Sequence, residues 1–467
     1  MRHLRYLPNL ALLLSLFMAV SCKVGKNYQA PDFAVPEGYL YGVNETDSLG
    51  DIRWWELFND PVLDTLIVKA VRNNQDLRIA MQSVEQAQLG LKIQRAELLP
   101  KISGQVNASR GNFQGFLGPS ANTNWSAVGS LSWELDLWGK LRRLNEAALA
   151  DYLSTEYGVK SVRLALVAEV ASTYLLLREY QASMEISEIQ LQLRDSSLRL
   201  VQARYDRGYA AEIDLNQAQI QRAIAASAVP AFNRLQLQAQ NALSLLIGEA
   251  PQSILDSVPL DSFAVTPNIP VGLPSELLRR RPDLLEAEQF IVAQNALVGV
   301  AIGNRFPSLS LTGLLGVASG GLGDLVSDGL AWNVGGNLLG PIFHWDQNKR
   351  RVEIERSRLE QTYLSYERQV LNAFREVEDA LVAIENYRLE VVARQQHVDA
   401  AINAQYLSSE RYDRGVTSYL EYLESQRQAF EAQLGLVSTR RSLLGSYVQL
   451  YKAMGGGWIT QEEEGSP

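Results

Sequence analysis

Side chains that could carry out chemistry are few in this chain and far apart. It has one cysteine, Cys22, and three histidines, His3, His344 and His397. A single cysteine excludes an internal disulfide framework and a zinc site built on several thiolates, and such scattered histidines do not predict a metal centre. No G-x-S-x-G, H-E-x-x-H or phosphate-binding glycine loop occurs. We therefore expect no enzyme, no bound metal and no cofactor other than a covalent lipid.

Composition and charge restrict the partners further. Hydrophobic residues make up 46% of the 467 residues, which is typical of a folded chain that can bury a large core. Lysine and arginine number 43 against 52 aspartates and glutamates, so the net charge is −9. Nucleic acid is therefore not an expected partner, because phosphate binding needs basic patches.

The one cysteine ends an apolar run near the N-terminus. Positive charge in Met1–Arg5 precedes Leu10–Val20, a run of eleven residues that is apolar except for Ser15. The run is too short to span a bilayer as a helix but long enough for the core of an export signal. Ala19-Val20-Ser21-Cys22 resembles a bacterial lipobox, with Ala19 in the place of the usual leucine. We expect residues 1–21 to be a signal peptide and Cys22 to carry acyl chains, which would hold the protein on a membrane. The alternative is an ordinary secreted protein with an incidental cysteine.

The chain contains two copies of one unit at a constant offset of 207 residues. This offset pairs Trp138 with Trp345, Pro100 with Pro307, and the run 204–208 (Arg-Tyr-Asp-Arg-Gly) with the same letters at 411–415. A repeat of this length predicts two domain-sized copies rather than a solenoid. We expect the following segments: N-terminal segment 22–62, first copy 63–250, proline-rich linker 251–274, second copy 275–457 and tail 458–467.

Each copy has the same expected order of elements. Helical spacing covers Leu63–Leu98 and Leu277–Gly303, each stopped before a proline. Two strand-like segments of alternating character follow in each copy. They form the expected hairpins 101–137 (Lys101–Ala108 with Asn124–Leu137) and 308–343 (Ser308–Val317 with Ala331–Phe343). Long helical hairpins are expected at 141–248 and 348–455.

The long helices lie in stretches almost free of proline. From Leu359 to Ile384 the apolar positions alternate in steps of four and three, the heptad pattern of coiled-coil packing. A helix over Leu141–Arg204 would be ~95 Å long at ~1.5 Å per residue. Gly208 and Gly415 are the expected C-terminal caps, and Pro230 predicts a kink or break in the first returning helix.

The strands cannot close a barrel within one chain. Four strands leave exposed edges, which lipid does not tolerate, whereas two copies of the chain would give eight strands and three would give twelve, enough for a water-filled lumen. The alternative is the core of a soluble β-sandwich. Tryptophans in and beside the strand segments are expected as membrane-interface aromatics: Trp125, Trp133, Trp138, Trp332 and Trp345.

The sequence resembles the TolC family of outer-membrane efflux proteins, in particular its lipoprotein branch (NodT- or OprM-like), which serves RND-type tripartite exporters. The likeness rests on Cys22 followed by 24–31 (VGKNYQAP), on 54–61 (WWELFNDP), on 278–284 (LRRRPDL) and on the duplicated Arg-Tyr-Asp-Arg-Gly run. It covers nearly the whole mature chain. Lys26 departs from it, because many members have proline there.

This resemblance implies a mainly α fold with membrane β structure. Three chains would share a twelve-stranded β-barrel in the outer membrane, continued by a long α-helical coiled-coil barrel in the periplasm, with the N-terminal segment at its equator. The implied partners are a second and third copy, a periplasmic adaptor (membrane fusion protein), an inner-membrane RND pump and outer-membrane lipid. The implied cargo is drugs or other small toxic compounds.

The resemblance also implies roles at the helical tip. Val416, Leu420 and Glu424 would line the closed pore, with Arg427 pairing with Glu424, and their spacing of four does place them on one helix stripe. Arg411 and Tyr412 would latch neighbouring chains. Arg207, Gly208, Arg414 and Gly415 would meet the adaptor. The alternative for the charges is a solvated helix face whose ion pairs contribute little.

Three other functions remain open from the sequence alone. An enzyme has no motif to support it. A structural coiled-coil periplasmic lipoprotein would explain the helices but not the tryptophan-bearing strands. Within the transporters, the exit duct of a type I protein secretion system is an alternative, although the lipobox together with Trp54-Trp55 favours the RND branch.

Overall fold

The computed structural model describes residues 23–31, 33, 36, 38–41, 58, 60–111, 122–254, 260, 263, 274–325, 327 and 329–456. The predicted signal peptide, Cys22 and the tail 458–467 lie outside them. The chain divides into two compact units. The first unit comprises Met1–Asp32, Gln82–Glu156 and Glu286–Glu367, and the second unit comprises Phe33–Met81, Tyr157–Leu285 and Arg368–Pro467.

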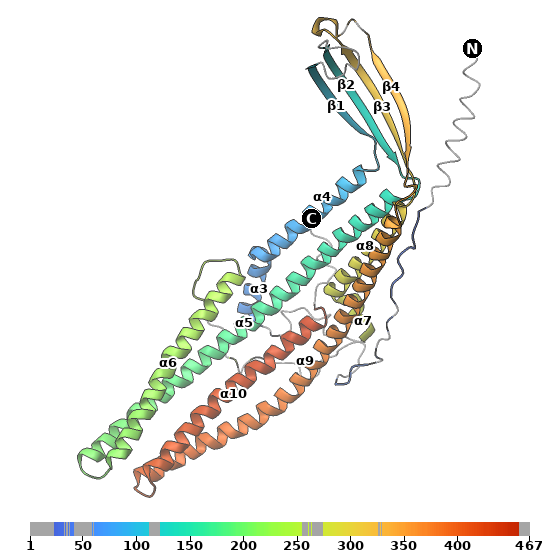
Figure 1. Cartoon of the computed structure of the whole chain (residues 1–467). Helices are drawn as coiled ribbons and strands as arrows, with labels where there is room; N and C mark the ends of the chain where they lie inside the picture. Colours follow the sequence, from blue (N-terminus) through green and yellow to red (C-terminus); the bar gives the residue numbers. More distant parts are fainter. Residues whose placement is uncertain are drawn as a thin grey trace. The chain divides into compact units, whose positions relative to one another are not determined.

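The first unit contains an antiparallel sheet of four strands in the order β1-β2-β3-β4 (Figure 1). The strands are β1 Lys101–Gly111, β2 Asn122–Leu135, β3 Ser308–Ser319 and β4 Ala331–Leu339. A short 3-10 helix, η3 (Leu322–Asp324), lies between β3 and β4. The two hairpins have the same strand register. Gly104 faces Gly129 in the first, and Leu311 faces Gly336, each 207 residues later, in the second. Pairing of β2 with β3 joins the two hairpins into one sheet.

Side chains of the outer strands have little cover within one chain. Every residue of β1 is exposed, and Val106 on β1 and Val334 on β4 are 83% and 78% exposed. Among the described residues, β1 and β4 each pair with one strand only. A soluble β-sandwich is therefore wrong for this sheet, because the described residues form a single sheet with no second sheet packed on it.

The first helix of each copy is interrupted, contrary to the prediction of one helix over Leu63–Leu98 and one over Leu277–Gly303. The observed helices are α3 Pro61–Asn73 and α4 Gln75–Ala96 in the first copy, and α7 Pro274–Arg280 and α8 Pro282–Gly303 in the second. Asn74 leaves the helical conformation and its Oδ1 accepts a hydrogen bond from the amide of Leu77 (3.0 Å). In the second copy Pro282 disfavours helix at the preceding residue.

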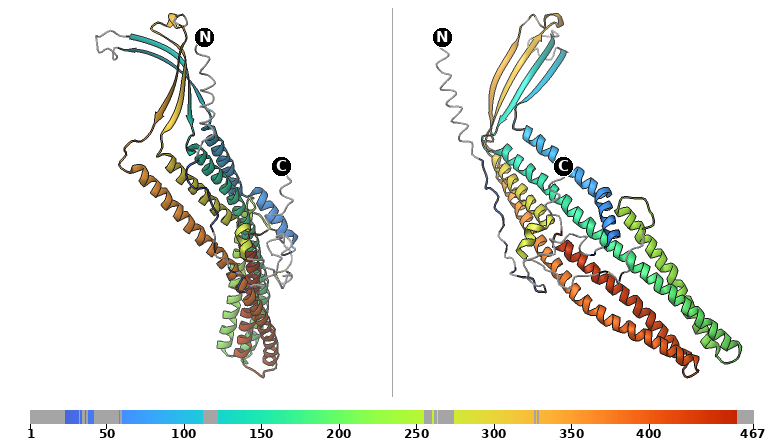
Figure 2. Two further views of the ribbon diagram at one scale, coloured as in Figure 1. Left: turned by 90° about the vertical axis from the view of Figure 1, so that its right-hand side faces the viewer. Right: turned by 180° about the vertical axis from the view of Figure 1, so that it is seen from behind.

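The predicted long helices are present (Figures 1 and 2). α5 (Lys140–Asp206) and α9 (Gln347–Asp413) each begin in the first unit and continue into the second. Within the second unit α5 runs antiparallel to α6 (Glu212–Leu246), and α9 to α10 (Tyr419–Ala453). Heptad positions of α9 are buried as expected, among them Val370, Ala373 and Val377. No helix in the described part of the chain is long and apolar enough to cross a membrane.

Pro230 does not break its helix, so the expected break does not occur, and a kink there stays a prediction. α6 continues from Glu212 to Leu246 with Pro230 inside it. Pro230 is exposed, and so solvent can satisfy the carbonyl group that loses its partner there.

Glycines end all four long helices, as predicted for Gly208 and Gly415. Gly208 and Gly415 have φ of +76° and +69°, and Gly248 and Gly455 have φ of +72° and +81°. After Gly208 the amide of Tyr209 donates to the carbonyl oxygen of Arg204 (2.8 Å), which is the long hydrogen bond of a Schellman motif. The equivalent bonds follow the other three glycines.

Candidate functional site

An aromatic cluster at the tip of the helical hairpins joins the two copies. We call this the tip cluster; its buried members are Val201, Leu215, Ala218, Tyr412, Tyr419 and Leu423. The ring of Tyr412 lies 5.4 Å from that of Tyr419 and 5.8 Å from that of Tyr422. Burial raises the pKa of both Tyr412 and Tyr419. The cluster is formed by α5, α6, α9 and α10, so it holds the two hairpins of one chain together.

Arg204 lies over the tip cluster and adds polar contacts between the copies. Its guanidinium lies 4.3 Å from the centre of the Tyr412 ring and donates to the carbonyl oxygens of Tyr412 (3.2 Å) and Asp413 (3.3 Å). The sequence analysis assigned the latch to the second-copy residues Arg411 and Tyr412 and not to this arginine. The equivalent Arg411 instead forms an exposed ion pair with Glu421 at 3.1 Å. The two copies therefore use the same arginine differently.

Two of the predicted constriction residues, Leu420 and Glu424, lie on α10, whereas Val416 precedes the helix and so is not on the single helix stripe that the spacing predicted. Val416, just before the helix, and Leu420 are each 67% exposed, and Glu424 follows one turn later. Arg427 pairs with Glu424 at 2.7 Å and also with Glu431 at 2.8 Å. Hydrogen bonds from Arg427 and Gln428 lower the pKa of Glu424. The predicted pairing is present, and the role of these residues in a pore stays a prediction.

The predicted latch and adaptor-contact residues surround the same tip. Tyr412 is only 6% exposed because it packs in the tip cluster, so a bridge to a neighbouring chain requires this tip to open first. Arg414 pairs with Glu410 at 3.0 Å. No atom lies within 4 Å of a Cβ built on Gly208 or Gly415, so both turns are open. Contacts of Arg207, Gly208, Arg411, Tyr412, Arg414 and Gly415 with other chains stay predictions.

A buried polar layer next to the tip cluster was missed by sequence reasoning. Gln426 of α10 is 1% exposed, and neither atom of its side-chain amide has a partner in the described part of the chain. Arg194 of α5 is 2% exposed, donates to the carbonyl oxygen of Gln221 (2.9 Å) and lies over the ring of Phe430 (5.2 Å). Burial lowers the pKa of Arg194. The available signal was the repeat itself, which pairs Gln426 with Gln219.

The five tryptophans have unlike environments. Trp125 and Trp133 lie on β2 and Trp332 on β4, whereas Trp138 and Trp345 lie beyond the ends of those strands. Trp138 stacks on Phe306 (4.7 Å) and donates from Nε1 to the carbonyl oxygen of Pro307 (2.8 Å). Trp345 is 85% exposed. A position of these side chains at a membrane interface stays a prediction.

Comparison with known families accounts for the duplicated strands and helices together. The family model described as outer membrane efflux protein matches the chain twice, at residues 66–249 and 273–456. The chain belongs to the outer membrane efflux protein family. The second match begins and ends 207 residues after the first, as 273 against 66 and 456 against 249 show, which is the offset found in the sequence. This chain is therefore an efflux protein of the outer membrane, and it has the TolC-like channel fold.

Curated relatives and solved structures cover nearly the whole chain. The solvent efflux pump outer membrane protein SrpC of Pseudomonas putida is 35% identical over 96% of this chain and 98% of its own length. The cation efflux system protein CusC of Escherichia coli is 32% identical over 94% and 96%. The open state of the Neisseria gonorrhoeae outer membrane channel MtrE superposes with a TM-score of 0.85 at 30% identity, over 93% and 98%. The Campylobacter jejuni outer membrane channel CmeC gives 0.86 at 28%, over 95% and 97%.

Proposed function

We propose that this efflux protein is the outer-membrane exit duct of a tripartite efflux system and works as a homotrimer. The observation that carries the proposal is the sheet of the first unit, in which β1 and β4 each pair with one strand and their side chains are exposed. Three such sheets joined edge to edge would make a closed barrel of about twelve strands, wide enough for water and solutes. Closure would satisfy the backbone groups of both edges, as lipid requires.

The helical hairpins of three chains would continue the duct into the periplasm and close it at the tip. There, three copies of Leu420 would form a hydrophobic constriction and three copies of Glu424 an acidic ring that disfavours anions. The exposure of Val416 and Leu420 in the single chain supports this role, because neither side chain is buried within the chain and both are free to face a pore. A periplasmic adaptor would contact the turns at Arg207–Gly208 and Arg414–Gly415, and an inner-membrane RND pump would load the duct.

The cargo that we propose is small toxic compounds such as drugs or solvents. Relatives are named as efflux proteins for solvents, for toluene, for antibiotics and for cations. A duct of this kind selects weakly, because the pump makes the selection. Deletion of the gene should therefore sensitise the cell to several organic compounds at once. Sensitivity to a metal ion alone would contradict this cargo, and loss of a single secreted protein would indicate the type I alternative.

The ion pair at the tip offers a direct test of the gate. In planar bilayers the double variant Glu424→Ala, Arg427→Ala should raise single-channel conductance several-fold and lower the preference for cations, because it removes both the pair and the acidic ring. The matched control is Arg375→Ala, Asp379→Ala, which removes an exposed pair of α9 with the same 2.7 Å separation away from the tip. Unchanged conductance in the first variant would exclude Glu424 and Arg427 from the gate.

We further propose that Cys22 carries a covalent lipid such as palmitate and anchors the protein to the outer membrane. The support is its position at the end of the apolar run and the absence of any other cysteine. Acyl chains would supplement the barrel as a second membrane attachment.

A further inference from the structure

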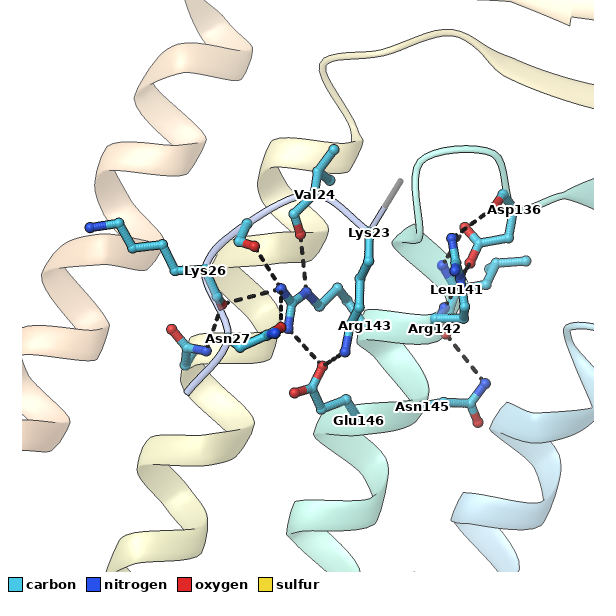
Figure 3. A network of polar contacts seen from close by, with 12 residues as sticks. Lys23, Val24, Lys26, Asn27, Asp136, Leu141, Arg142, Arg143, Asn145 and Glu146 are labelled. Carbon is cyan, nitrogen blue, oxygen red and sulfur yellow. Dashed lines mark hydrogen bonds and ion pairs between the residues drawn. The ribbon is translucent and has the colours of Figure 1, made fainter. Parts of the chain in front are cut away.

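An extended N-terminal segment is held against the parts of α5 and α8 that belong to the first unit (Figure 3). We call residues 23–28 the strap. The amide of Val24 donates to the carbonyl oxygen of Trp138 (3.1 Å), and Asn295 of α8 donates to the carbonyl oxygen of Lys26 (3.1 Å). The hydroxyl of Tyr28 donates to Glu288 of α8 (2.8 Å). The strap therefore has fixed partners along its whole length.

Arg143 of α5 is the centre of these contacts. Its side chain is fully buried and donates from Nε to the carbonyl oxygen of Val24 (3.0 Å). Nη2 donates to Gly25 (2.7 Å), to Lys26 (3.2 Å) and to the side chain of Asn27 (3.2 Å), as Figure 3 shows. Nη1 donates to Glu146 (2.8 Å), which also pairs with Lys23 (2.5 Å). Without the strap, most donors of a buried guanidinium would lose their acceptors, which is costly.

Three glycines allow the strap to lie this close to the helices. A Cβ on Gly25, where φ is +87°, would be 3.0 Å from Cα of Gly299, and a Cβ on Gly299 would be 2.8 Å from Nε of Arg143. A Cβ on Gly139, where φ is +74°, would be 2.8 Å from Cα of Lys23. The strap, the helix face and the arginine are thus fitted to one another.

The second copy shows that this burial is specific to the strap. The offset of 207 pairs Arg143 with Arg350 and Glu146 with Glu353, and the second pair is also formed, at 2.7 Å. The Arg350 side chain, however, is 66% exposed. The same pair of an arginine and a glutamate three residues later is therefore a solvated ion pair in one copy and part of a buried clamp in the other.

We propose that Arg143 is a positioning residue that clamps the strap at the base of the first β-hairpin, so that the N-terminal lipid and the β-strands enter the membrane as one rigid unit. The proposal rests on the lipidation of Cys22 proposed above. Cys22 directly precedes Lys23, and the strap residue Val24 is bonded to Trp138, three residues after the end of β2. Two membrane attachments joined rigidly reinforce each other, whereas a loose connection lowers their effective concentration.

The test compares clamp variants in the full-length protein expressed in cells. Arg143→Met removes the hydrogen bonds that Arg143 itself donates to the strap. Gly25→Ala disturbs the strap side only, and Arg350→Met is the matched control in the second copy. In both clamp variants, amide hydrogen exchange of the strap should rise by at least about tenfold. Heat-resistant oligomer in the outer membrane should fall by about tenfold, and palmitate labelling, lost in Cys22→Ser, should stay as in the wild type. Arg350→Met should match the wild type in all three measurements.

The outcomes separate the clamp from the lipid. Faster hydrogen exchange of the strap together with a wild-type yield of oligomer would overturn the positioning role. Hydrogen exchange of the strap as slow as in the wild type in both clamp variants would overturn it as well. If Arg143→Met fails to fold, Gly25→Ala decides between these outcomes. Wild-type protein without palmitate would overturn lipidation at Cys22 and the lipid part of the inference, and strap exchange with oligomer yield would still decide whether Arg143 positions the strap for assembly.

Discussion

Arg281 shows how a single residue of the second copy connects segments far apart in the chain. It is buried and pairs with Asp283 and Glu376, both at 2.7 Å, and it donates to the carbonyl oxygen of Ala453 (3.2 Å). Burial alone would raise the pKa of Asp283, but the hydrogen bonds and charge of Arg281 outweigh it and lower this pKa. The group thus ties the start of α8 to α9 and to the end of α10 within the second unit.

This pair predicts a pH dependence of stability. Because the folded pKa of Asp283 is lowered, its contribution is present above the unfolded value, 3.8, and is lost as the pH falls through the folded pKa. At pH 7, Asp283→Asn should lower the free energy of unfolding by about 3 kcal/mol, because a buried arginine loses a charge partner. Denaturant unfolding at pH 7 and pH 3 measures both effects, and the difference between variant and wild type should shrink at pH 3.

The control for this prediction is Asp379→Asn. Asp379 is 63% exposed and pairs with Arg375 on the same helix, so its loss should cost at most about 0.5 kcal/mol. Equal effects of the two substitutions would contradict the account of Asp283.

At the level of elements, four helix ends use the same glycine cap in two different settings. A Cβ on Gly208 would meet nothing within 4 Å, whereas a Cβ on Gly248 would be 2.5 Å from the carbonyl oxygen of Asn73. Gly455 in the second copy is similarly close to the carbonyl oxygen of Arg280, at 2.9 Å. The returning helices therefore pack their ends on the first helix of their own copy.

Alanine substitution should separate the two settings. Gly208→Ala should cost about 1 kcal/mol, the strain of a left-handed backbone alone. Gly248→Ala adds a clash with backbone and should cost at least about 3 kcal/mol. Thermal unfolding of the purified protein in detergent would measure the difference. Similar losses would mean that the contact with Asn73 does not matter.

The buried polar layer predicts a substitution that stabilises the packing of α10 next to the tip cluster. Gln426 buries an amide that has no partner in the described residues, so Gln426→Leu should raise the free energy of unfolding by about 1–2 kcal/mol. Because the layer lies where α10 meets α5, tighter packing there should also lower the open probability of the channel. Melting temperature and single-channel recording measure the two effects, and a destabilised variant would show that the amide has a partner in the assembled protein.

At the level of the whole molecule, the sheet is incomplete in one chain. If three chains close the proposed barrel, β1 of one chain must lie beside β4 of the next. A cysteine at Val106, with a second cysteine scanned over residues 332–338, should give disulfide-linked species of two and three chains on denaturing gels. Linkage should depend on the scanned position, since only laterally paired residues have Cα atoms about 5 Å apart. Absence of linked chains along the whole scan would refute a shared barrel.

Much of this fold could be predicted from the sequence because its signals are local. The offset of 207, the heptads of α9 and the alternation in the strands each report burial along one element. The glycine caps at Gly208 and Gly415 follow from the left-handed conformation that ends a helix. The same reasoning placed Glu424 and Arg427 within reach of each other, because residues three apart share a helix face.

Contacts between distant segments were decided by the tertiary structure. Pairing of β2 with β3 and the burial of Tyr412 against Arg204 join separate copies, and nothing within either copy specifies them. Arg143 and Arg350 make the point most directly. Each pairs with a glutamate three residues later, because helix geometry is local. Only Arg143 is buried, because burial depends on which remote segment packs against the helix, and the strap lies more than a hundred residues away in the sequence.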